Sequence, residues 1–320
     1  MISKNLSDQE GSEKPSKVQY VTITSEFEDT RLDNFLIRTF KAVPKSRIYR
    51  AIRGGEVRIN KGRIKPEYKL KAGDIVRIPP LVNEVTPMAA VSASMEEVLR
   101  SSIIYEDEHL FVLNKPASLA VHAGSGIRGG VIEAMRMMYP DLALELVHRL
   151  DKETSGCLMV AKKRSSLKAL QRALEAGMIT KTYLAWVAGH WPKSLQNVEM
   201  PLRRFESRGG ERRVCVDEEG KASQTLFRPL HCQDGATLLE CRIITGRTHQ
   251  IRVHTSANGH PIIGDEKYGR REVNATFRER GMKRMMLHAS RLEINCPDLG
   301  LKLTVHAPCA LFDVEMSKGE

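Results

Sequence analysis

Most of the positive charge of this 320-residue chain lies in one short segment. Residues 31–77 contain 14 lysines and arginines against four acids, a net +10 of the +11 carried by the whole chain. Apolar residues recur within that segment at helical spacing: Leu32, Phe35, Leu36 and Phe40 share one face. A segment with its own apolar pattern and its own charge is expected to fold as a separate small domain, and a chain of this length is expected to hold two domains.

The order of elements in the basic segment follows from its apolar spacing and its turn residues. A first helix is predicted from Leu32 to Phe40 and a second from Ser46 to the Gly54-Gly55 stop. Alternating residues then predict short strands over 56–59 and 76–78. Arg47, Arg50 and Arg53 recur every third residue of the second helix and form a basic stripe.

So concentrated a charge indicates a polyanionic partner, because each phosphate that is neutralised releases condensed counterions. A solvated basic surface is the alternative, although ten net charges in one small domain exceed ordinary mixed-sign solvation. From Arg31 to Pro79 the segment resembles the αL RNA-binding module of a small-subunit ribosomal protein, in Arg-Leu-Asp-Asn-Phe-Leu, Lys-Ser-Arg-Ile-Tyr-Arg and Gly-Glu-Val-Arg-Ile-Asn. The resemblance implies structured RNA as the partner. The candidate RNA-binding residues are Arg47, Arg50, Arg53, Arg58, Lys61 and Arg63.

The whole chain is predicted to divide into four regions. Residues 1–17 are a polar tail predicted to be disordered, 18–82 the αL-type domain, 83–100 a linker and 101–315 a second domain. In the second domain strands are predicted near 103–105, 110–113, 146–150 and 157–161, and helices over 131–138 and around Leu167 to Gly177. Strands and helices mix without regular βαβ alternation, which predicts an α+β fold.

Composition excludes several classes of protein. The sequence contains no apolar run of about 18 residues, so no membrane span is predicted. The N-terminus is polar and lacks the apolar stretch of a secretory signal, which predicts a cytoplasmic protein. None of the six cysteines forms a Cys-x-x-Cys pair, so neither a structural zinc site nor a redox dithiol is predicted.

Polar residues concentrate at four places in the second domain, and the fourth, Leu287-His288-Ala289, is too short to predict anything by itself. Asp151 follows a predicted strand within His148-Arg149-Leu150-Asp151, where a carboxylate flanked by bases can act as nucleophile or base, although such an Asp is often only a turn residue. Lys181 and Tyr183 share one face of a predicted strand, where the tyrosine could stack on a base or simply fill the strand. Arg247 lies at the mouth of a predicted helix that stops at Asn258-Gly259, a position that favours an anion.

Taken together and in this order, the motifs from about 101 to 310 resemble those of the ribosomal large-subunit branch of the pseudouridine synthases. The resemblance rests on Leu113-Asn114-Lys115-Pro116, Val121-His122-Ala123-Gly124, His148-Arg149-Leu150-Asp151, Thr154-Ser155-Gly156, Lys181 with Tyr183, Thr245-Gly246-Arg247-Thr248-His249-Gln250-Ile251-Arg252 and Leu287-His288-Ala289. It implies a catalytic domain with a mixed, mainly antiparallel sheet. It also implies an isomerase that converts uridines of large-subunit (23S) ribosomal RNA to pseudouridine without a cofactor or metal. A monomer suits an enzyme that must approach a large folded RNA, and no membrane is expected to take part.

The roles that the resemblance implies fall on seven residues. Asp151 is the essential carboxylate, Arg247 its ion-pair partner and Tyr183 the residue that stacks on the uracil and assists the final proton transfer. Arg149 assists extrusion of the nucleotide. Lys181, His148 and Leu287 complete the substrate-binding set, with Leu287 packed against the flipped ring.

Three alternatives stay open from the sequence. A glycoside hydrolase would use Asp151 and Glu153 as paired carboxylates. A metal ion would use His249 and His254, but their spacing of five residues does not place both on one helix face. A non-catalytic RNA-binding protein or ribosome assembly factor would need only the basic domain.

Overall fold

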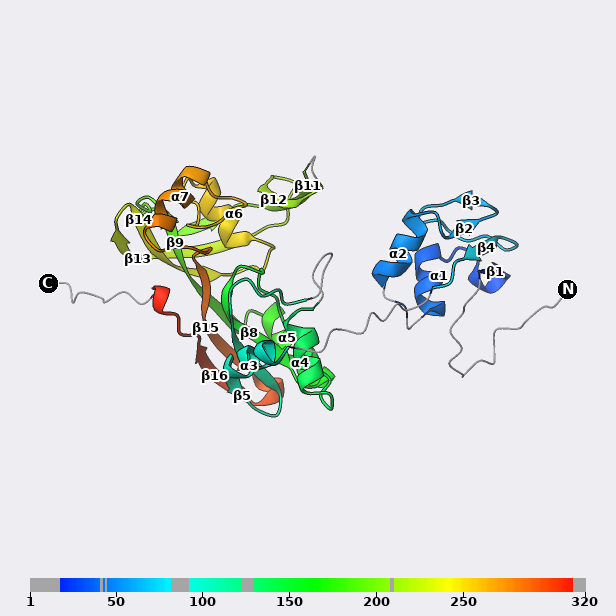
Figure 1. Ribbon diagram of the computed structural model, residues 1–320, viewed down its shortest axis with the longest axis horizontal. Coiled ribbons are helices and arrows are strands. Elements are labelled where there is room, and N and C mark those ends of the chain that lie inside the picture. Colours follow the sequence, from blue (N-terminus) through cyan, green and yellow to red (C-terminus); the bar gives the residue numbers. More distant parts are fainter. Residues whose placement is uncertain are drawn as a thin grey trace. The chain divides into compact units, whose positions relative to one another are not determined.

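The computed structural model describes residues 18–40, 43, 45–81, 92–122, 129–207 and 210–312. Their contacts divide the chain into two compact units, Met1–Pro87 and Met88–Glu320 (Figure 1). The predicted tail, residues 1–17, lies outside the described residues. No helix in the described ranges is long and apolar enough to cross a membrane.

The first unit packs two helices, α1 (Leu32–Thr39) and α2 (Lys45–Arg53), with one antiparallel sheet. The sheet order is β1-β4-β2-β3, with β1 Gln19–Thr22, β2 Arg58–Ile59, β3 Gly62–Arg63 and β4 Ile75–Ile78. The helical face predicted from the sequence is confirmed, because Leu32, Phe35 and Leu36 are buried together with Ile48 and Ile52 of α2. The second helix begins at Lys45, one residue before the predicted start.

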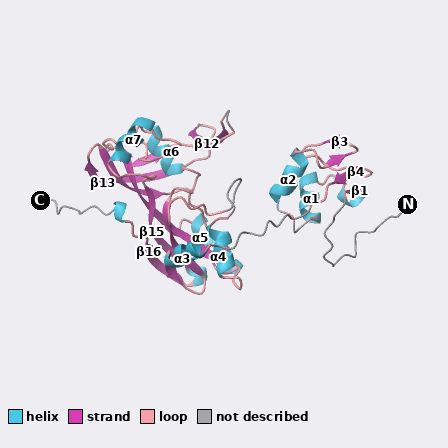
Figure 2. Ribbon diagram, in the orientation of Figure 1, coloured by secondary structure: helices cyan, strands magenta, loops and turns pink. Residues whose placement is uncertain are grey.

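The second unit is built on one large sheet of order β10-β13-β14-β9-β15-β8-β6-β5, with β16 on β15 and β7 on β8 (Figure 2). Every strand pair in this described sheet is antiparallel except β15 with β8, so the predicted mixed, mainly antiparallel sheet of an α+β fold is confirmed. The strands span β5 Ile103–Glu106, β6 Leu110–Lys115, β7 Glu145–Leu146, β8 Ser155–Ala161, β9 Ile179–Ala188, β10 Asn197–Glu199, β13 Gln224–Gln233, β14 Ala236–Ile243, β15 Leu287–Cys296 and β16 Leu301–His306.

Helices lie at both ends of this sheet (Figure 1). Near β5 and β8 are α3 (Ala93–Ser101), α4 (Val131–Met138) and α5 (Arg164–Glu175). Near β9, β13 and β14 are α6 (Gln250–Ala257) and α7 (Arg271–Glu279). A separate hairpin, β11 (Leu202–Glu206) with β12 (Arg212–Val216), packs on α6 through Leu202, Val214 and Val253.

Two predicted boundaries are corrected. The predicted linker ran to residue 100, but α3 begins at Ala93, because the Ser92 hydroxyl caps it and Leu99 is fully buried. The strand predicted over 146–150 is only β7, which ends at Leu146. The backbone N–H of Val147 still donates to the carbonyl oxygen of Met159, but the N–H of Met159 donates to the His148 ring instead of to a backbone carbonyl, and the strand goes no further.

The centre of the sheet is where β15 runs between β9 and β8. Gly156 on β8 allows β15 to approach closely: its φ is +107°, and a Cβ there would lie 2.2 Å from the carbonyl oxygen of Ala289. This contact brings the end of the loop that carries Asp151 beside the strand that begins at Leu287.

Candidate active site

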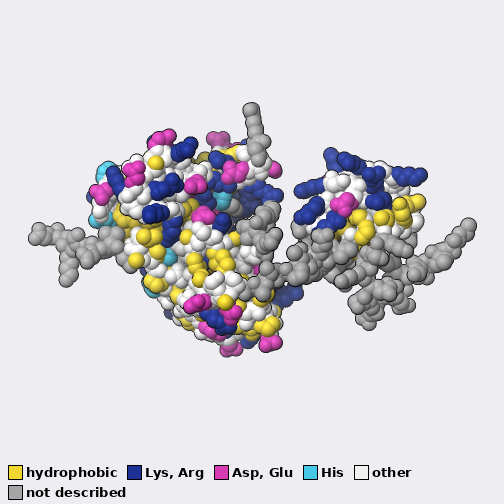
Figure 3. All heavy atoms as spheres, viewed as in Figure 1, with side chains coloured by type: hydrophobic (Ala, Val, Ile, Leu, Met, Phe, Trp, Pro, Cys, Tyr) yellow, Lys and Arg dark blue, Asp and Glu magenta, His cyan; other side chains and the backbone are white. Residues whose placement is uncertain are grey.

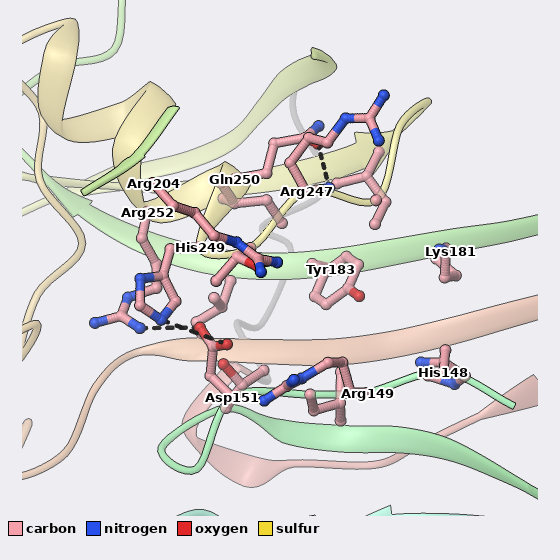
Figure 4. Close-up of a pocket in the computed structure, with 17 residues that line it drawn as sticks. His148, Arg149, Asp151, Lys181, Tyr183, Arg204, Arg247, His249, Gln250 and Arg252 are labelled. Atoms are coloured by element: carbon pink, nitrogen blue, oxygen red, sulfur yellow. Dashed lines mark hydrogen bonds and ion pairs between the residues drawn. The ribbon is translucent and has the colours of Figure 1, made fainter. Parts of the chain in front are cut away.

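A pocket of about 290 Å³ opens at this central crossing (Figure 4). It is lined by residues from the loop before β8, from β9, from the turn before α6 and from the hairpin. Those with polar or aromatic side chains include His148, Arg149, Asp151, Lys181, Tyr183, Arg204, Arg247, His249, Gln250 and Arg252, and Leu287 closes the apolar side. All seven residues predicted for catalysis or substrate binding therefore line one pocket, although they span residues 148–287.

Asp151 lies on the pocket wall with its carboxylate held at one oxygen. Arg252 Nη1 donates to Oδ2 at 2.9 Å, and His249 Nε2 lies 3.8 Å from Oδ1. The carboxylate side chain is 21% exposed, so it is partly accessible from the pocket. Arg252 thus holds one oxygen, and the other lies closest to His249.

Arg252 is in turn fixed by a buried ion pair. Its Nε and Nη2 donate to the two oxygens of Asp265 at 2.8 and 2.9 Å, and Asp265 is 1% exposed. The ring of Tyr268 lies against the guanidinium at 5.0 Å. Burial alone would lower the pKa of Arg252, but Asp265 and Asp151 outweigh it and the pKa is raised. Arg252 therefore presents a permanent positive charge to Asp151.

An arginine pairs with Asp151 as predicted, but it is Arg252 and not Arg247. Arg247 lies in the turn before α6, where its Nε donates to the carbonyl oxygen of Ala222 at 3.0 Å, and its side chain points away from Asp151 (Figure 4). Arg252 lies inside α6, which begins at Gln250, and the helix turns it towards Asp151. Gln250 Oε1 accepts from the backbone N–H of Arg247 and fixes the turn that separates the two arginines.

Tyr183 and Lys181 lie on the same side of β9, as the alternation predicted, and both line the pocket. Burial, with a smaller contribution from Asp151, raises the pKa of Tyr183, so its phenol is protonated at neutral pH. Burial lowers the pKa of Lys181, and among the described residues its ammonium has no hydrogen-bond partner. Leu287 is 4% exposed and pairs with Ala185 across β15 and β9.

Arg149 and His148 behave differently although they are adjacent. Arg149 is exposed at the pocket mouth, where its guanidinium is available to a ligand. His148 Nε2 accepts the backbone N–H of Met159, and burial lowers its pKa to about 3. His148 is therefore a neutral ring whose Nε2 is already occupied, and only its other nitrogen is left for a ligand.

Four residues that contact Asp151 or its partners were not predicted in that role from the sequence: Arg252, His249, Asp265 and Tyr268. Arg252 lies between the apolar Ile251 and Val253, and an arginine in a helix that buries its neighbours needs a charged partner. That signal was present. The Gly-Asp-x-x-Tyr-Gly run at 264–269, which supplies the partner, carried no recognisable pattern of its own.

The candidate RNA-binding residues lie in the first unit. Arg50, Arg53, Arg58, Lys61 and Arg63 are exposed, and basic side chains gather over the α2 and β3 face (Figure 3). Arg47 differs, because it donates to both carboxylate oxygens of Glu56 at 3.1 and 2.8 Å. Arg53 lies over the ring of Tyr49 at 5.7 Å, beside a hollow that both residues line together with Arg50 and Gly54.

The described residues contain no group of three or more His, Cys, Asp or Glu side chains arranged to hold a metal ion. His254, considered with His249 from the sequence, is buried and hydrogen-bonded at Nε2 to Ser223 and at Nδ1 to Thr225. His249 lines the pocket instead.

Comparison with known proteins gives one consistent result. Residues 109–257 match the family model described as RNA pseudouridylate synthase, and residues 30–76 match that of the S4 domain. The chain is 49% identical over 302 residues to ribosomal large subunit pseudouridine synthase C of Escherichia coli (strain K12), with 93% of this chain and 94% of that protein covered. It is 48% identical over 304 residues to the protein of the same name from Pasteurella multocida, with 94% and 92% covered.

Among solved structures, the human RNA pseudouridylate synthase domain containing 1 is similar, with a TM-score of 0.55 and 29% sequence identity. The match covers 66% of this chain and 86% of that one.

Proposed function

Because the chain belongs to the RNA pseudouridine synthase family, we propose that Asp151 is the carboxylate with which it isomerises uridines of large-subunit (23S) ribosomal RNA. The single observation that carries this proposal is the geometry of Asp151, which lines the pocket with a partly exposed carboxylate that Arg252 holds at one oxygen. We place the reaction in the cytoplasm, with ribosomal RNA as the partner and the monomer as the active form.

The reaction needs few groups from the protein. The bond between the ribose carbon C1′ and the ring nitrogen N1 breaks, the uracil turns, and C1′ bonds to C5. The proton on C5 leaves and N1 gains one, so no atom is gained or lost overall. An ionised carboxylate can serve as nucleophile at C1′ or as base towards a sugar proton, and both routes require Asp151 charged and aimed. The hydrogen bond from Arg252 to Oδ2 at 2.9 Å holds the carboxylate in a fixed direction.

The remaining pocket residues suit a single extruded base. Tyr183 presents a buried, protonated ring on which a uracil can stack, and Leu287 supplies an apolar contact. With its pKa raised, the phenol keeps its proton at neutral pH and cannot act as a base there, so we assign Tyr183 to holding the uracil before any proton transfer. A base stacked in a duplex cannot enter such a pocket, and the exposed Arg149 at the mouth is suited to hold the flipped nucleotide.

The first unit supplies affinity rather than chemistry. Its exposed basic residues Arg50, Arg53, Arg58, Lys61 and Arg63 can contact phosphates, which gives strong and salt-dependent binding. Arg47 is assigned the secondary role of holding Glu56, because that pair already uses its guanidinium.

The test uses large-subunit ribosomal RNA from cells that lack this protein, with pseudouridine mapped after incubation with purified full-length protein. Wild type is expected to convert specific uridines, and Asp151→Asn none, with RNA binding retained. Glu153→Gln is the matched control, because this neighbouring acid is bonded to Ser118 and has no assigned role in the reaction.

Each alternative function has its own result. If Glu153→Gln also abolishes activity, a second carboxylate takes part, as in glycoside hydrolysis. If wild type binds the RNA but converts no uridine, the protein is a non-catalytic RNA-binding or assembly factor and the proposed function is wrong.

A further inference from the structure

Two hydrogen bonds and one longer polar contact connect the β11–β12 hairpin to Asp151 through Tyr268 and His249, which the proposed reaction does not use. The backbone N–H of Val214 on β12 donates to the Tyr268 hydroxyl at 3.0 Å. The Tyr268 hydroxyl lies 2.6 Å from Nδ1 of His249. His249 Nε2 then lies 3.8 Å from Oδ1 of Asp151, the carboxylate oxygen that Arg252 does not hold.

The direction of these bonds follows from counting protons. Val214 can only donate, so the Tyr268 oxygen accepts there, and its own proton is free to donate to His249 Nδ1. A histidine that accepts at Nδ1 carries its proton at Nε2 when neutral. The opposite tautomer would turn a lone pair at Nε2 towards the Asp151 carboxylate and leave the tyrosine proton unused. Burial lowers the pKa of His249 to about 4 against the opposing effect of Asp151, so the ring is neutral at neutral pH.

The backbone at His249 indicates that this placement is imposed. His249 has φ 54° and ψ 21°, the left-handed region that L-residues other than glycine seldom adopt. Such a conformation persists only where the surroundings fix it. Here the side chain is fixed by Tyr268, and the residue before it is fixed by the hydrogen bond that Arg204 of β11 donates to Thr248.

The loop that carries Tyr268 meets all three parts of this arrangement. Asp265 holds Arg252, Tyr268 holds His249, and Lys267 contacts the hairpin through Glu211 at 2.9 Å and the carbonyl oxygen of Arg212 at 2.6 Å. The Tyr268 side chain also packs with Leu202, Val214 and Val253. A displacement of the hairpin would therefore move Tyr268 and, through it, the ring of His249.

We propose that Tyr268 is a positioning residue that holds His249 as the neutral Nε2–H form directed at Asp151 and ties this orientation to the hairpin. Arg252 then fixes one carboxylate oxygen and His249 faces the other with an N–H. The inference rests on the proposed function only for its effect on catalysis, because the tautomer of His249 exists without substrate.

The first test is nitrogen-15 NMR of the full chain labelled at histidine, with His249→Gln used to assign the His249 signals. At pH 7 the wild type is expected to show a protonated Nε2 and an unprotonated Nδ1. Tyr268→Phe, which keeps the ring but loses the hydroxyl, is expected to shift His249 towards the Nδ1–H form. A charged or Nδ1–H His249 in wild type, or a spectrum unchanged by Tyr268→Phe, overturns the proposal. If Tyr268→Phe does not fold, the wild-type spectrum still decides.

The second test is kinetic. Tyr268→Phe is expected to lower kcat on the order of tenfold with KM for RNA nearly unchanged, because the ground-state contacts to RNA remain. The matched control is Tyr105→Phe. Tyr105 lies on β5, outside the pocket, and its hydroxyl donates to Asp107, so its loss should leave kcat as in wild type.

His249→Gln places an amide N–H donor near the position of Nε2 without a choice of tautomer, so adding Tyr268→Phe to it should lower kcat much less than in the wild-type background. Equal losses in both backgrounds overturn the positioning role. Because the NMR result does not depend on turnover, an inactive wild type with the expected tautomer would count against the proposed function and not against this contact.

Discussion

Replacing Arg252 by glutamine tests the buried ion pair that supports Asp151. The substitution leaves Asp265, which is 1% exposed, as a buried carboxylate without its cation. Breaking one side of a buried pair typically costs 3–5 kcal/mol, and two backbone N–H donors, from Lys267 and Tyr268, still serve Asp265 Oδ1, so we expect about 3 kcal/mol. For a unit of this size that loss lowers Tm by about 6–12 °C.

The assay is thermal unfolding of the full chain followed on the second unit, with Arg149→Gln as the control. Arg149 lies in the same pocket but is exposed, so the same substitution there should change stability by less than about 0.5 kcal/mol. Arg252→Gln is also expected to be inactive. A melting temperature within about 2 °C of the control, with the same unfolding enthalpy, would refute the reasoning that this pair supports the site.

The pH dependence of stability tests the same ion pair independently. Burial would raise the pKa of Asp265, but Arg252 outweighs it and the pKa is lowered. A carboxyl with a lowered folded-state pKa stabilises the fold above its unfolded pKa, about 3.9, and that stability is lost as the pH falls through the folded-state pKa. Without Arg252 burial raises the pKa of Asp265, so the carboxyl can protonate in the fold. The difference in free energy of unfolding between wild type and Arg252→Gln should therefore be largest near pH 7 and become smaller below about pH 4.

Three further predictions concern Gly156, Lys115 and the exposed pair Arg50 and Arg53. Gly156→Ala should cost more than about 3 kcal/mol, because its Cβ would meet the backbone of β15 and its φ is positive, whereas Gly235→Ala, with open space around it, should cost only about 1 kcal/mol; urea unfolding separates them. Lys115→Met should cost about 2–4 kcal/mol in the same assay, since the buried ammonium donates to three main-chain carbonyl oxygens. Replacing Arg50 and Arg53 together by glutamine should weaken RNA binding and reduce the slope of log affinity against log salt by about 1–2, measured by filter binding; an unchanged slope would contradict a phosphate-binding role.

Local patterns predicted the elements well where one face of the element is buried. The helix from Leu32 was predicted because Leu32, Phe35 and Leu36 must share a face, and all three are buried. Helix α6 was likewise predicted between Arg247 and Asn258, and it spans Gln250–Ala257. The predictions failed where a side chain replaces a backbone partner, as His148 does for Met159, because alternation cannot show which ladder bonds a ring nitrogen will take.

The sequence predicted which residues line the candidate site better than it predicted the contacts between those residues. Asp151, Tyr183 and Lys181 were brought together by motif order, and the pocket contains them. The choice between Arg247 and Arg252 needed the phase of α6 relative to the loop before β8, which depends on contacts across about a hundred residues of sequence. Tyr268 and Asp265 act through other side chains and not on the pocket directly, so no local pattern marked them.

The place of β15 in the sheet has a consequence for biosynthesis. Asp151, Tyr183 and Arg252 are all translated before β15 begins at Leu287, yet β15 is the strand that joins β9 to β8. Pairing over such sequence separations is slow and leaves strand edges open until it is complete. A growing chain would therefore contain Asp151, Tyr183 and Arg252 before the pocket around them can form, and we expect a product truncated before residue 287 to be inactive and prone to aggregate. Activity therefore requires β15, which lies in the last part of the chain to be synthesised.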